Sequence, residues 1–284
     1  MQDEKPSATA WRVAVARAAH QVLDHPKIFD DPLALRIVGA GADGRSPATL
    51  VSDRYRRSIR AKFLRAVLIA RSRIAEDALV AAFARGVRQY VVLGAGLDTF
   101  AYRHRHAGLH VFEVDHPATQ AWKRTILGHA GIPEPESLNF VAVDFERQTA
   151  MEGLRAAGFD RESPAFFAWL GVTMYLREEV VYSVLREIAS LPSPSGVAFD
   201  YALASSELSM LARIGVAAAN RRLTREGEPW LTFFKPHELD AKLREIGFRE
   251  VHDWSPDDIN TAFFGNRSDG LRVSSVARVV VASA

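Results

Sequence analysis

The stretch QYVVLGAGLDTFAYR, residues 89–103, decides the fold class of this chain. Its opening QYVVL is largely apolar and β-branched, which is typical of a strand buried on both faces of a sheet. The strand pattern meets a glycine turn at Gly94 and Gly96, and a helix is expected to begin near Asp98. Glycine lets a backbone approach a ligand closely, and the N-terminus of a following helix favours an anionic group. The stretch therefore predicts an α/β fold with a ligand site after a buried strand.

Further strand-like runs follow this stretch, and helix-like segments separate them. Continuous apolar runs belong in a parallel sheet with helices on both faces, and this alternation indicates a doubly wound α/β fold. We expect helices at 117–129 and 178–189. The last two strand candidates, 251–256 and 273–284, would close the sheet as an antiparallel pair. The others span residues 109–115, 138–144, 164–170 and 196–202.

The chain before this pattern is different in kind. Residues 1–85 are expected to form a helical cap and residues 86–284 a sheet-containing core, with a helical insertion at about 203–235. A long helical pattern over residues 52–84 places Arg71 on an apolar face. The other side chains of that face are Val67, Leu68, Ile74, Ala75 and Ala78.

An inward-facing arginine needs an anion. A buried guanidinium without a carboxylate or phosphate partner is costly. We therefore expect Arg71 to bind either an anionic ligand group or an internal carboxylate, for which Glu76 and Asp115 are the candidates.

Two acidic residues stand at the ends of later strands. Asp115 lies 19 residues after Gly96, close to the spacing of about 20 expected of a ribose-binding carboxylate. Asp144 ends the next strand in the same way. Because parallel strands present their carboxyl ends at one edge, Gly94, Gly96 and both aspartates should converge on one crevice. The set fits a nucleoside-bearing cofactor. The alternative is that each aspartate is a helix N-cap.

Composition excludes several classes of protein. The 284 residues include 36 Lys+Arg and 34 Asp+Glu, and this near-balance argues against a dedicated nucleic-acid-binding protein. There is no cysteine, which removes disulfides, thiol nucleophiles and cysteine-ligated metals. No signal-peptide pattern and no run of 18 apolar residues occurs, so we expect no membrane span and a cytoplasmic protein. Residues 52–77 are locally basic, which would steer an anionic substrate.

In combination and order, several segments resemble the leucine carboxyl methyltransferase-like family of S-adenosylmethionine-dependent methyltransferases, including its bacterial branch that acts on polyketide-type carboxylic acids and other small molecules. The resemblance spans about residues 26–191. It implies the class I methyltransferase Rossmann-like fold, mostly parallel with an antiparallel C-terminal strand, and S-adenosyl-L-methionine as cofactor. The segments are FDDPLALRIVG (29–39), ARSR (70–73), VVLGAGLDTFAYR (91–103), FEVDHPATQAWKR (112–124), VAVDFE (141–146) and WLGVTMYL (169–176).

The resemblance also implies roles for single residues. Arg71 matches the arginine that pairs with the methionine carboxylate of the cofactor, and Asp115 matches the ribose-binding aspartate. Leu170 departs from the family, because many members carry there a glutamate that contacts the amino-acid end of the cofactor; the departure implies a different grip on the cofactor's ammonium. Tyr175 matches the family tyrosine and is either a positioning residue of the site or a core aromatic. The remaining cofactor positions are Gly94, Gly96, Asp98, the neighbouring His116, and the adenine-contacting pair Asp144 and Phe145.

Methyl transfer from a sulfonium is an in-line displacement, in which the enzyme mainly aligns the acceptor with the methyl carbon. A carboxylic acid is already ionised at pH 7 and needs no general base, whereas a phenol would gain from one. We expect O-methylation of a small molecule at a carboxylate, without a base or a metal. Should a base be used, the candidates are His104, His106, His116 and His237, the first two of which are expected to be solvated.

Other readings stay open. Thr99 stands where the dinucleotide fingerprint needs glycine or alanine, and no Tyr-x-x-x-Lys pair occurs, which disfavours a nicotinamide-dependent oxidoreductase. The departure at Leu170 leaves room for a non-catalytic cofactor-binding protein, and a homodimer is also open. Side chains of the cap and insertion predict an apolar or aromatic acceptor, unless they only pack the lid. They include Trp11, Met210, Trp230, Phe233 and Phe234.

Overall fold

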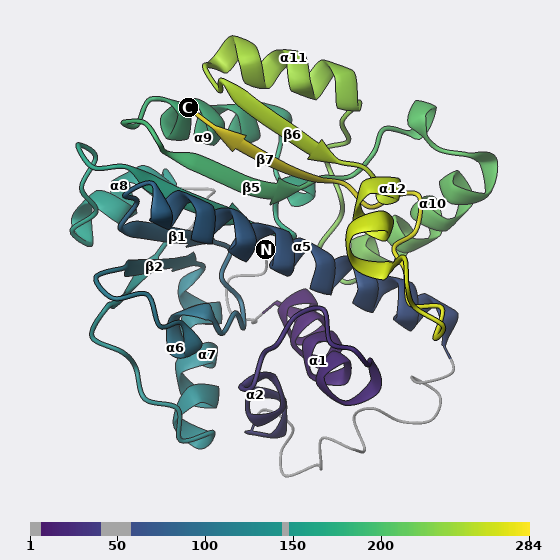
Figure 1. Cartoon of the computed structure of the whole chain (residues 1–284), viewed down its shortest axis with the longest axis horizontal. Helices are drawn as coiled ribbons and strands as arrows, with labels where there is room; N and C mark the ends of the chain where they lie inside the picture. The colour runs from purple at the N-terminus through teal and green to yellow at the C-terminus, as the bar shows by residue number, and fades with distance from the viewer. Residues whose placement is uncertain (1–6, 41–57, 144–147) are drawn as a thin grey trace.

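The chain folds around one twisted seven-stranded sheet (Figure 1) in a computed structural model that describes residues 7–40, 58–143 and 148–284. The strand order is β3-β2-β1-β4-β5-β7-β6; β7 is antiparallel to both neighbours and the other pairs are parallel. This arrangement confirms the predicted doubly wound sheet and its antiparallel C-terminal pair. The strands are β1 (Gln89–Leu93), β2 (His110–Asp115), β3 (Leu138–Ala142), β4 (Ala165–Trp169), β5 (Gly196–Asp200), β6 (Glu250–Trp254) and β7 (Val279–Ser283).

The predicted strands are all present, but the last is shorter than its pattern. β1, β4 and β5 are buried along their whole length, as continuous apolar runs require. The run from residue 273 becomes a strand only at Val279. Before that point, the Val273 amide donates to Asn260 Oδ1 at 2.9 Å, and the side chains of Val273 and Ala277 pack into the core outside the sheet. The apolar pattern therefore marked burial correctly and strand conformation only in part.

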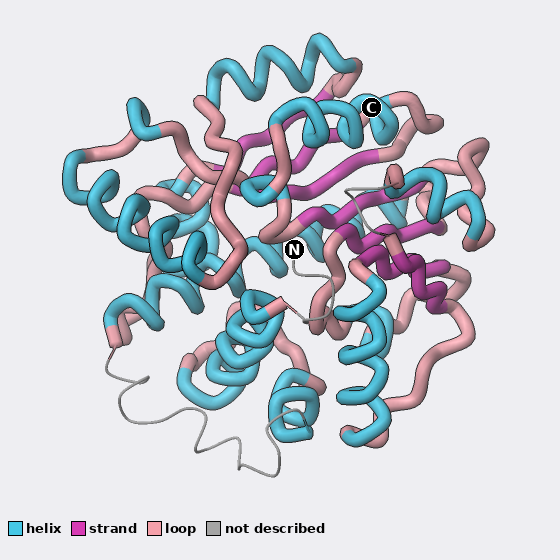
Figure 2. The backbone as a smooth tube through the Cα atoms, turned by 180° about the vertical axis from the view of Figure 1, so that it is seen from behind, coloured by secondary structure: helices cyan, strands magenta, loops and turns pink. Residues whose placement is uncertain are grey.

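Helices cover both faces of the sheet, as Figure 2 shows from behind. One face packs against α8 (Ala150–Ala156), α9 (Glu178–Ala189) and α11 (Pro236–Ile246), whose buried side chains share the largest core. The other face packs against α5 (Ile59–Ala84) and α6 (Phe100–Arg103). Glu113 of β2 reaches α7 (Pro117–His129) on that face. The helices predicted at 117–129 and 178–189 have the bounds expected.

The long helix α5 begins later than its pattern predicts. Ser58 is its N-cap, and the Ser58 side chain accepts a hydrogen bond from the Ala61 amide at 3.2 Å. A serine in this role satisfies one of the free amides at a helix start. Residues 52–57 lie outside the described part of the chain, and with them three of the seven arginines of the basic stretch, Arg54, Arg56 and Arg57.

The N-terminal helices α1 (Ala8–Leu23) and α2 (Ala34–Ala40) pack directly against the sheet-containing core. Ala14 and Ala18 of α1 share a buried cluster with Leu97 of the glycine turn and with Leu127 of α7. Figure 1 shows α1 and α2 lying below α5, on the side where β1 leads into α6. Helix α1 is thereby fixed against the glycine turn of the predicted ligand crevice.

The insertion is built around α10 (Met210–Arg225), which has no buried residue.

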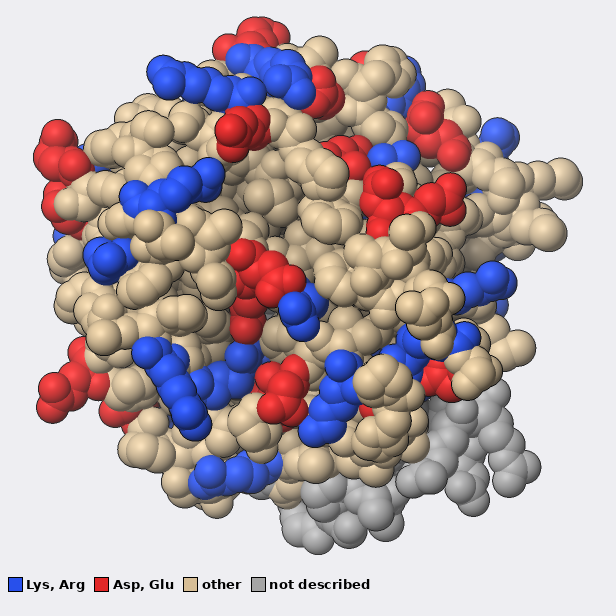
Figure 3. Space-filling view, in the orientation of Figure 1, with Lys and Arg blue, Asp and Glu red and all other residues tan. Residues whose placement is uncertain are grey.

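Basic and acidic side chains are interspersed over the face that Figure 3 shows. Within the described ranges, no helix combines the length and apolar character needed to cross a membrane. The shorter helical elements are a 3₁₀ turn at Thr173–Tyr175, another at Ser205–Glu207, α12 (Pro256–Ile259) and a π-helical turn at Asn260–Phe264.

Candidate cofactor site

The glycine turn folds back onto the end of β2. Gly94 and Gly96 adopt left-handed φ angles of 69° and 49°, which side-chain-bearing residues rarely adopt. The Gly96 amide donates to Asp115 Oδ2 at 2.5 Å, and the His116 amide donates to Asp115 Oδ1 at 2.7 Å. The structure thus brings Gly94, Gly96 and Asp115 together at the carboxyl edge of the sheet, as their spacing predicts.

Asp115 is not the N-cap of the helix that follows it, so that alternative is wrong. His116 is the N-cap of α7, and its Nδ1 accepts from the Ala118 amide at 3.2 Å. Burial raises the pKa of Asp115, while its hydrogen bonds from the two backbone amides oppose the shift. Asp144 and Phe145 lie outside the described residues, so their predicted role remains a prediction.

Asp98 and Thr99 tie the turn to α1. Arg17 pairs with Asp31 at 2.6 Å and with Asp98 at 3.2 Å, and its Nη2 donates to Thr99 Oγ1 at 2.5 Å. Thr99 in turn donates to Asp31 Oδ2 at 2.8 Å. Burial alone would raise the pKa of Asp98, but the charges of Arg17 and Arg103 hold it below its usual range. The threonine that breaks the dinucleotide fingerprint is therefore a buried anchor for the N-terminal helices.

Arg71 does face inward, but its partner is neither of the predicted carboxylates. Its Nη1 lies 2.7 Å from Asp200 Oδ2, and both side chains are buried. Glu76 pairs instead with Arg103, and Asp115 accepts from the two backbone amides. The candidate partners Glu76 and Asp115 are therefore wrong. Asp200 closes β5 as Asp115 closes β2, and that shared position was the signal that could have identified it.

The loop after β4 packs against both the turn and Arg71. The Gly171 amide donates to Asp200 Oδ1 at 2.5 Å. A Cβ placed on Gly171, whose φ is 75°, would lie 2.8 Å from the Arg71 guanidinium, and one on Gly94 would lie 2.4 Å from Val172 Cγ2. Leu170 is half-buried and packs on the core beneath α5. The backbone of Gly171 thus lies close to the Arg71 side chain, and the backbone of Gly94 lies close to the Val172 side chain.

Tyr175 lies where α1, the insertion and the loop after β4 meet. Burial raises the pKa of Tyr175, while the nearby side chains of Trp230 and Thr9 oppose the shift. Glu228 of the insertion accepts hydrogen bonds from Ser7 and Thr9 at the start of α1. This contact seats the first turn of α1 near the glycine turn, since Ala10 Cβ would lie 3.1 Å from a Cβ on Gly96.

The lid side chains divide between packing and exposure. Phe234 is part of the largest core, and Trp11 packs against Trp122 with ring centroids 6.2 Å apart. Met210 is 78% exposed, so it gives no support for an apolar acceptor. Trp230 and Phe233 are half-buried and lie edge to face, with centroids 6.3 Å apart.

The histidines considered as bases have other surroundings. His104 and His106 are half-buried rather than solvated, because their rings stack on Phe100 and on each other. Burial lowers the pKa of His104. His237 is exposed on α11, and His116 caps α7.

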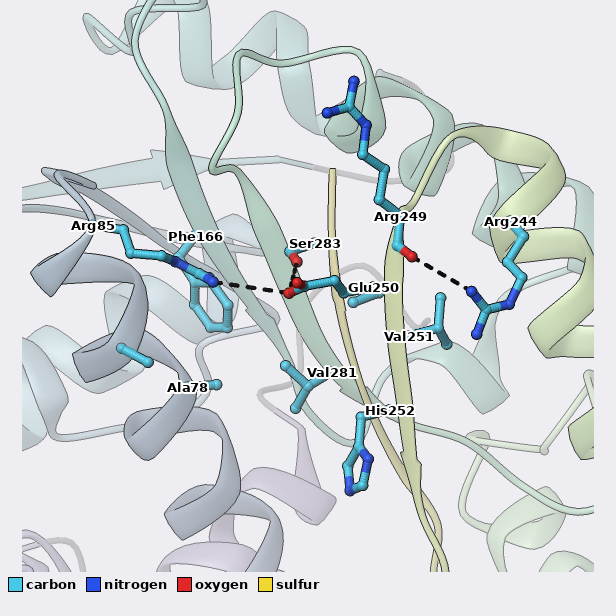
Figure 4. Close-up of a pocket in the computed structure, with 12 residues that line it drawn as sticks. Ala78, Arg85, Phe166, Arg244, Arg249, Glu250, Val251, His252, Val281 and Ser283 are labelled. Carbon is cyan, nitrogen blue, oxygen red and sulfur yellow. Dashed lines mark hydrogen bonds and ion pairs between the residues drawn. The ribbon is translucent and has the colours of Figure 1, made fainter.

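A hollow of about 410 Å³ lies at the opposite edge of the sheet (Figure 4). Figure 4 shows Arg85 of the α5 C-terminus reaching towards Glu250, which also contacts Ser283. Ser283 pairs with Gly196 at the amino end of β5. This hollow is therefore distinct from the crevice that holds Asp115 and Asp200.

Behind the crevice, a buried ion pair should make stability pH-dependent. Burial raises the pKa of Glu113 to about 7, against the opposing charge of Lys123 at 2.6 Å. This pKa exceeds the ordinary value of 4.5, so the folded chain binds the Glu113 proton more tightly than the unfolded chain does. The stability that Glu113 contributes is therefore fully present below about pH 4.5 and is lost as the pH rises through about 7. Urea denaturation from pH 4.5 to 8 should record a loss of up to about 3 kcal/mol from this group. The control is the Glu113→Gln/Lys123→Met variant, which should lack this pH-dependent part of the free energy of unfolding. If the free energy of unfolding varied with pH in the same way for the variant and the wild type, the assignment to Glu113 would be wrong.

Comparison with known proteins shows the family to which this chain belongs. A family model described as leucine carboxyl methyltransferase matches residues 10–189. YktD of Bacillus subtilis, which is named as an S-adenosyl-L-methionine-dependent methyltransferase, is 32% identical over 291 residues, covering 95% of each chain. A Mycolicibacterium paratuberculosis protein named in the same way is 30% identical over 251 residues, covering 85% of this chain and 77% of its own. A solved O-methyltransferase family protein from Burkholderia thailandensis is 14% identical with a TM-score of 0.49, covering 82% of this chain and 62% of its own.

The fold and the crevice define a class I Rossmann-like methyltransferase, as the resemblance implied. The chain belongs to the leucine carboxyl methyltransferase family, and S-adenosyl-L-methionine is its cofactor. The nicotinamide-dependent oxidoreductase alternative is therefore wrong.

Proposed function

We propose that this methyltransferase transfers the methyl group to an oxygen of a small molecule, and that the acceptor oxygen belongs to a carboxylate. The observation that carries the choice of acceptor is the placement of the candidate bases. His104 and His106 stack on Phe100, His116 caps a helix and His237 is exposed. A carboxylate is ionised at pH 7 and reacts without such a base.

The residues of the crevice fit the cofactor. Among the described residues, Asp115 accepts one backbone donor on each oxygen, which leaves lone pairs for the two ribose hydroxyls. The glycine turn lets backbone come close to the nucleoside, and Arg71 offers a guanidinium to the carboxylate of the amino-acid end. Asp98 would act through the turn, because its carboxylate is already held by Arg17 and the Phe100 amide.

When bound, the cofactor supplies an electrophilic methyl carbon on a sulfonium. The acceptor oxygen would form the new C–O bond as the C–S bond breaks, which would leave a neutral thioether, so the reaction would need no further reactant. The protein's part is alignment and exclusion of water. Tyr175 would position the acceptor, because Tyr175 lies between α1 and the insertion. The insertion would cover the bound acceptor.

Two measurements test this function. Titration calorimetry with S-adenosylmethionine, S-adenosylhomocysteine and NAD should show binding of the first two only. Transfer from methyl-labelled cofactor to a panel of small carboxylic acids and phenols should give products that alkali hydrolyses, because esters are labile and aryl ethers are stable. Alkali-stable product would assign a hydroxyl acceptor instead, and binding without transfer to any acceptor would favour the non-catalytic alternative.

A further inference from the structure

The carboxylate of Asp200 is the feature of the crevice that the resemblance does not assign. It stands at the carboxyl end of β5, on a side chain that is 8% exposed, on the sheet face crossed by α5. Arg71 Nη1 donates to Oδ2 at 2.7 Å and the Gly171 amide donates to Oδ1 at 2.5 Å. These two groups are its donors within the described ranges, and an ionised carboxylate can accept about four hydrogen bonds, so each oxygen has a lone pair for another donor.

Arg71 and Asp200 together form a fixed pair of opposite charges. An α-amino acid end also carries two opposite charges, a carboxylate and an ammonium. A guanidinium beside a carboxylate is complementary to both groups at once, because each charge finds its opposite. A lone arginine would bind the carboxylate of the ligand but would repel its ammonium.

The carboxylates described near the crevice have other roles. Asp98 and Glu76 are held by arginines, and Asp115, at the end of β2, accepts from the Gly96 amide of the glycine turn. Leu170, at the end of β4, brings no charge. Asp200 is the last residue of the neighbouring strand β5, which pairs with β4 through Trp169 and Phe199, so its carboxylate stands one strand away from Leu170 at the same edge.

We propose that Asp200 accepts hydrogen bonds from the ammonium group of the cofactor while Arg71 binds the cofactor's carboxylate. This inference rests on the proposed function, because it deepens how the same site grips S-adenosylmethionine. The absence of a Cβ at Gly171 belongs to the same arrangement, since a side chain there would lie 2.8 Å from the guanidinium.

The test compares two ligands that differ by one group. The ligands are S-adenosylhomocysteine and its analogue in which hydrogen replaces the α-ammonium. Calorimetry on the wild-type chain should show the analogue binding about 10- to 100-fold more weakly, the range expected for a charged hydrogen bond. Asp200→Asn should abolish this difference by weakening only the complete ligand. Asp253→Asn is the matched control, because Asp253 is a partly buried carboxylate on β6 that also meets an arginine, Arg278, and a second donor, Tyr201; it should keep the wild-type difference.

The outcomes separate the two levels of inference. Equal weakening of both ligands by Asp200→Asn would overturn the proposal, since Asp200 would then act only through Arg71. Wild-type protein that binds the two ligands equally well would overturn it as well, while leaving the proposed function intact. Wild-type protein that binds neither form of the cofactor would overturn the proposed function together with this inference. If Asp200→Asn does not fold, Arg71→Met/Asp200→Leu keeps the test, because it should weaken both ligands and show no preference for the ammonium.

Discussion

Gly94→Ala is expected to lower the free energy of unfolding by about 2 to 5 kcal/mol, the sum of a left-handed backbone and a steric clash. The φ of Gly94 is 69°, and an added Cβ would lie 2.4 Å from Val172 Cγ2. A γ-methyl on a short β-branched side chain cannot swing aside as the end of a long side chain can. The turn also carries the Gly96 amide that donates to Asp115, so cofactor affinity should fall with stability.

A second glycine separates the two causes. Gly108 has a nearly equal φ of 73°, but an added Cβ there would meet nothing within 4 Å. Gly108→Ala should therefore cost only the backbone term, about 1 to 2 kcal/mol. In urea denaturation, Val172→Ala should recover the difference when combined with Gly94→Ala, as a double-mutant cycle measures. Equal losses for the two glycine variants would show that the contact with Val172 contributes nothing.

The part of the site that could be predicted depends on local sequence. The glycine turn and Asp115 belong to one strand–helix–strand unit, and the rule that parallel strands end at one edge places them together. Asp115 Oδ2 indeed accepts from the Gly96 amide, only 19 residues away. The inward face of Arg71 follows in the same way from helix periodicity.

Partners far apart in the sequence could not be predicted in this way. Arg71 and Asp200 are 129 residues apart, and Arg17 and Asp98 are 81 apart. Helix periodicity says that an arginine is buried but not which carboxylate lies opposite, because that depends on how α5 crosses the sheet. The sequence offered nearer acids, Glu76 and Asp115, and both are held elsewhere. Arg17 had no signal beyond being one of two arginines in an alanine-rich helix.

Arg71→Ala is expected to weaken cofactor binding strongly, and the pairing with Asp200 adds a cost in stability. Removing one partner of a buried ion pair leaves the other charge uncompensated, which typically costs about 3 to 5 kcal/mol. An arginine that only bound cofactor could be removed without this loss. The side chains of Arg71 and Asp200 are 9% and 8% exposed, so water compensates little. Calorimetry should therefore record weaker binding of S-adenosylhomocysteine, and urea denaturation should record a lower free energy of unfolding.

Arg71→Met/Asp200→Leu distinguishes binding from folding. Replacing a buried ion pair with apolar side chains of similar volume is often neutral or stabilising, so most of the stability lost in Arg71→Ala should return. Cofactor binding should stay weak, because neither charge of the amino-acid end finds its opposite. The cofactor affinity of Arg71→Lys should lie between those of the wild type and the double variant. A lysine keeps the charge but lacks the planar fork that holds a carboxylate with two hydrogen bonds. Wild-type affinity in the double variant would mean that the pair only stabilises the fold, and that the cofactor's carboxylate is bound elsewhere in the crevice.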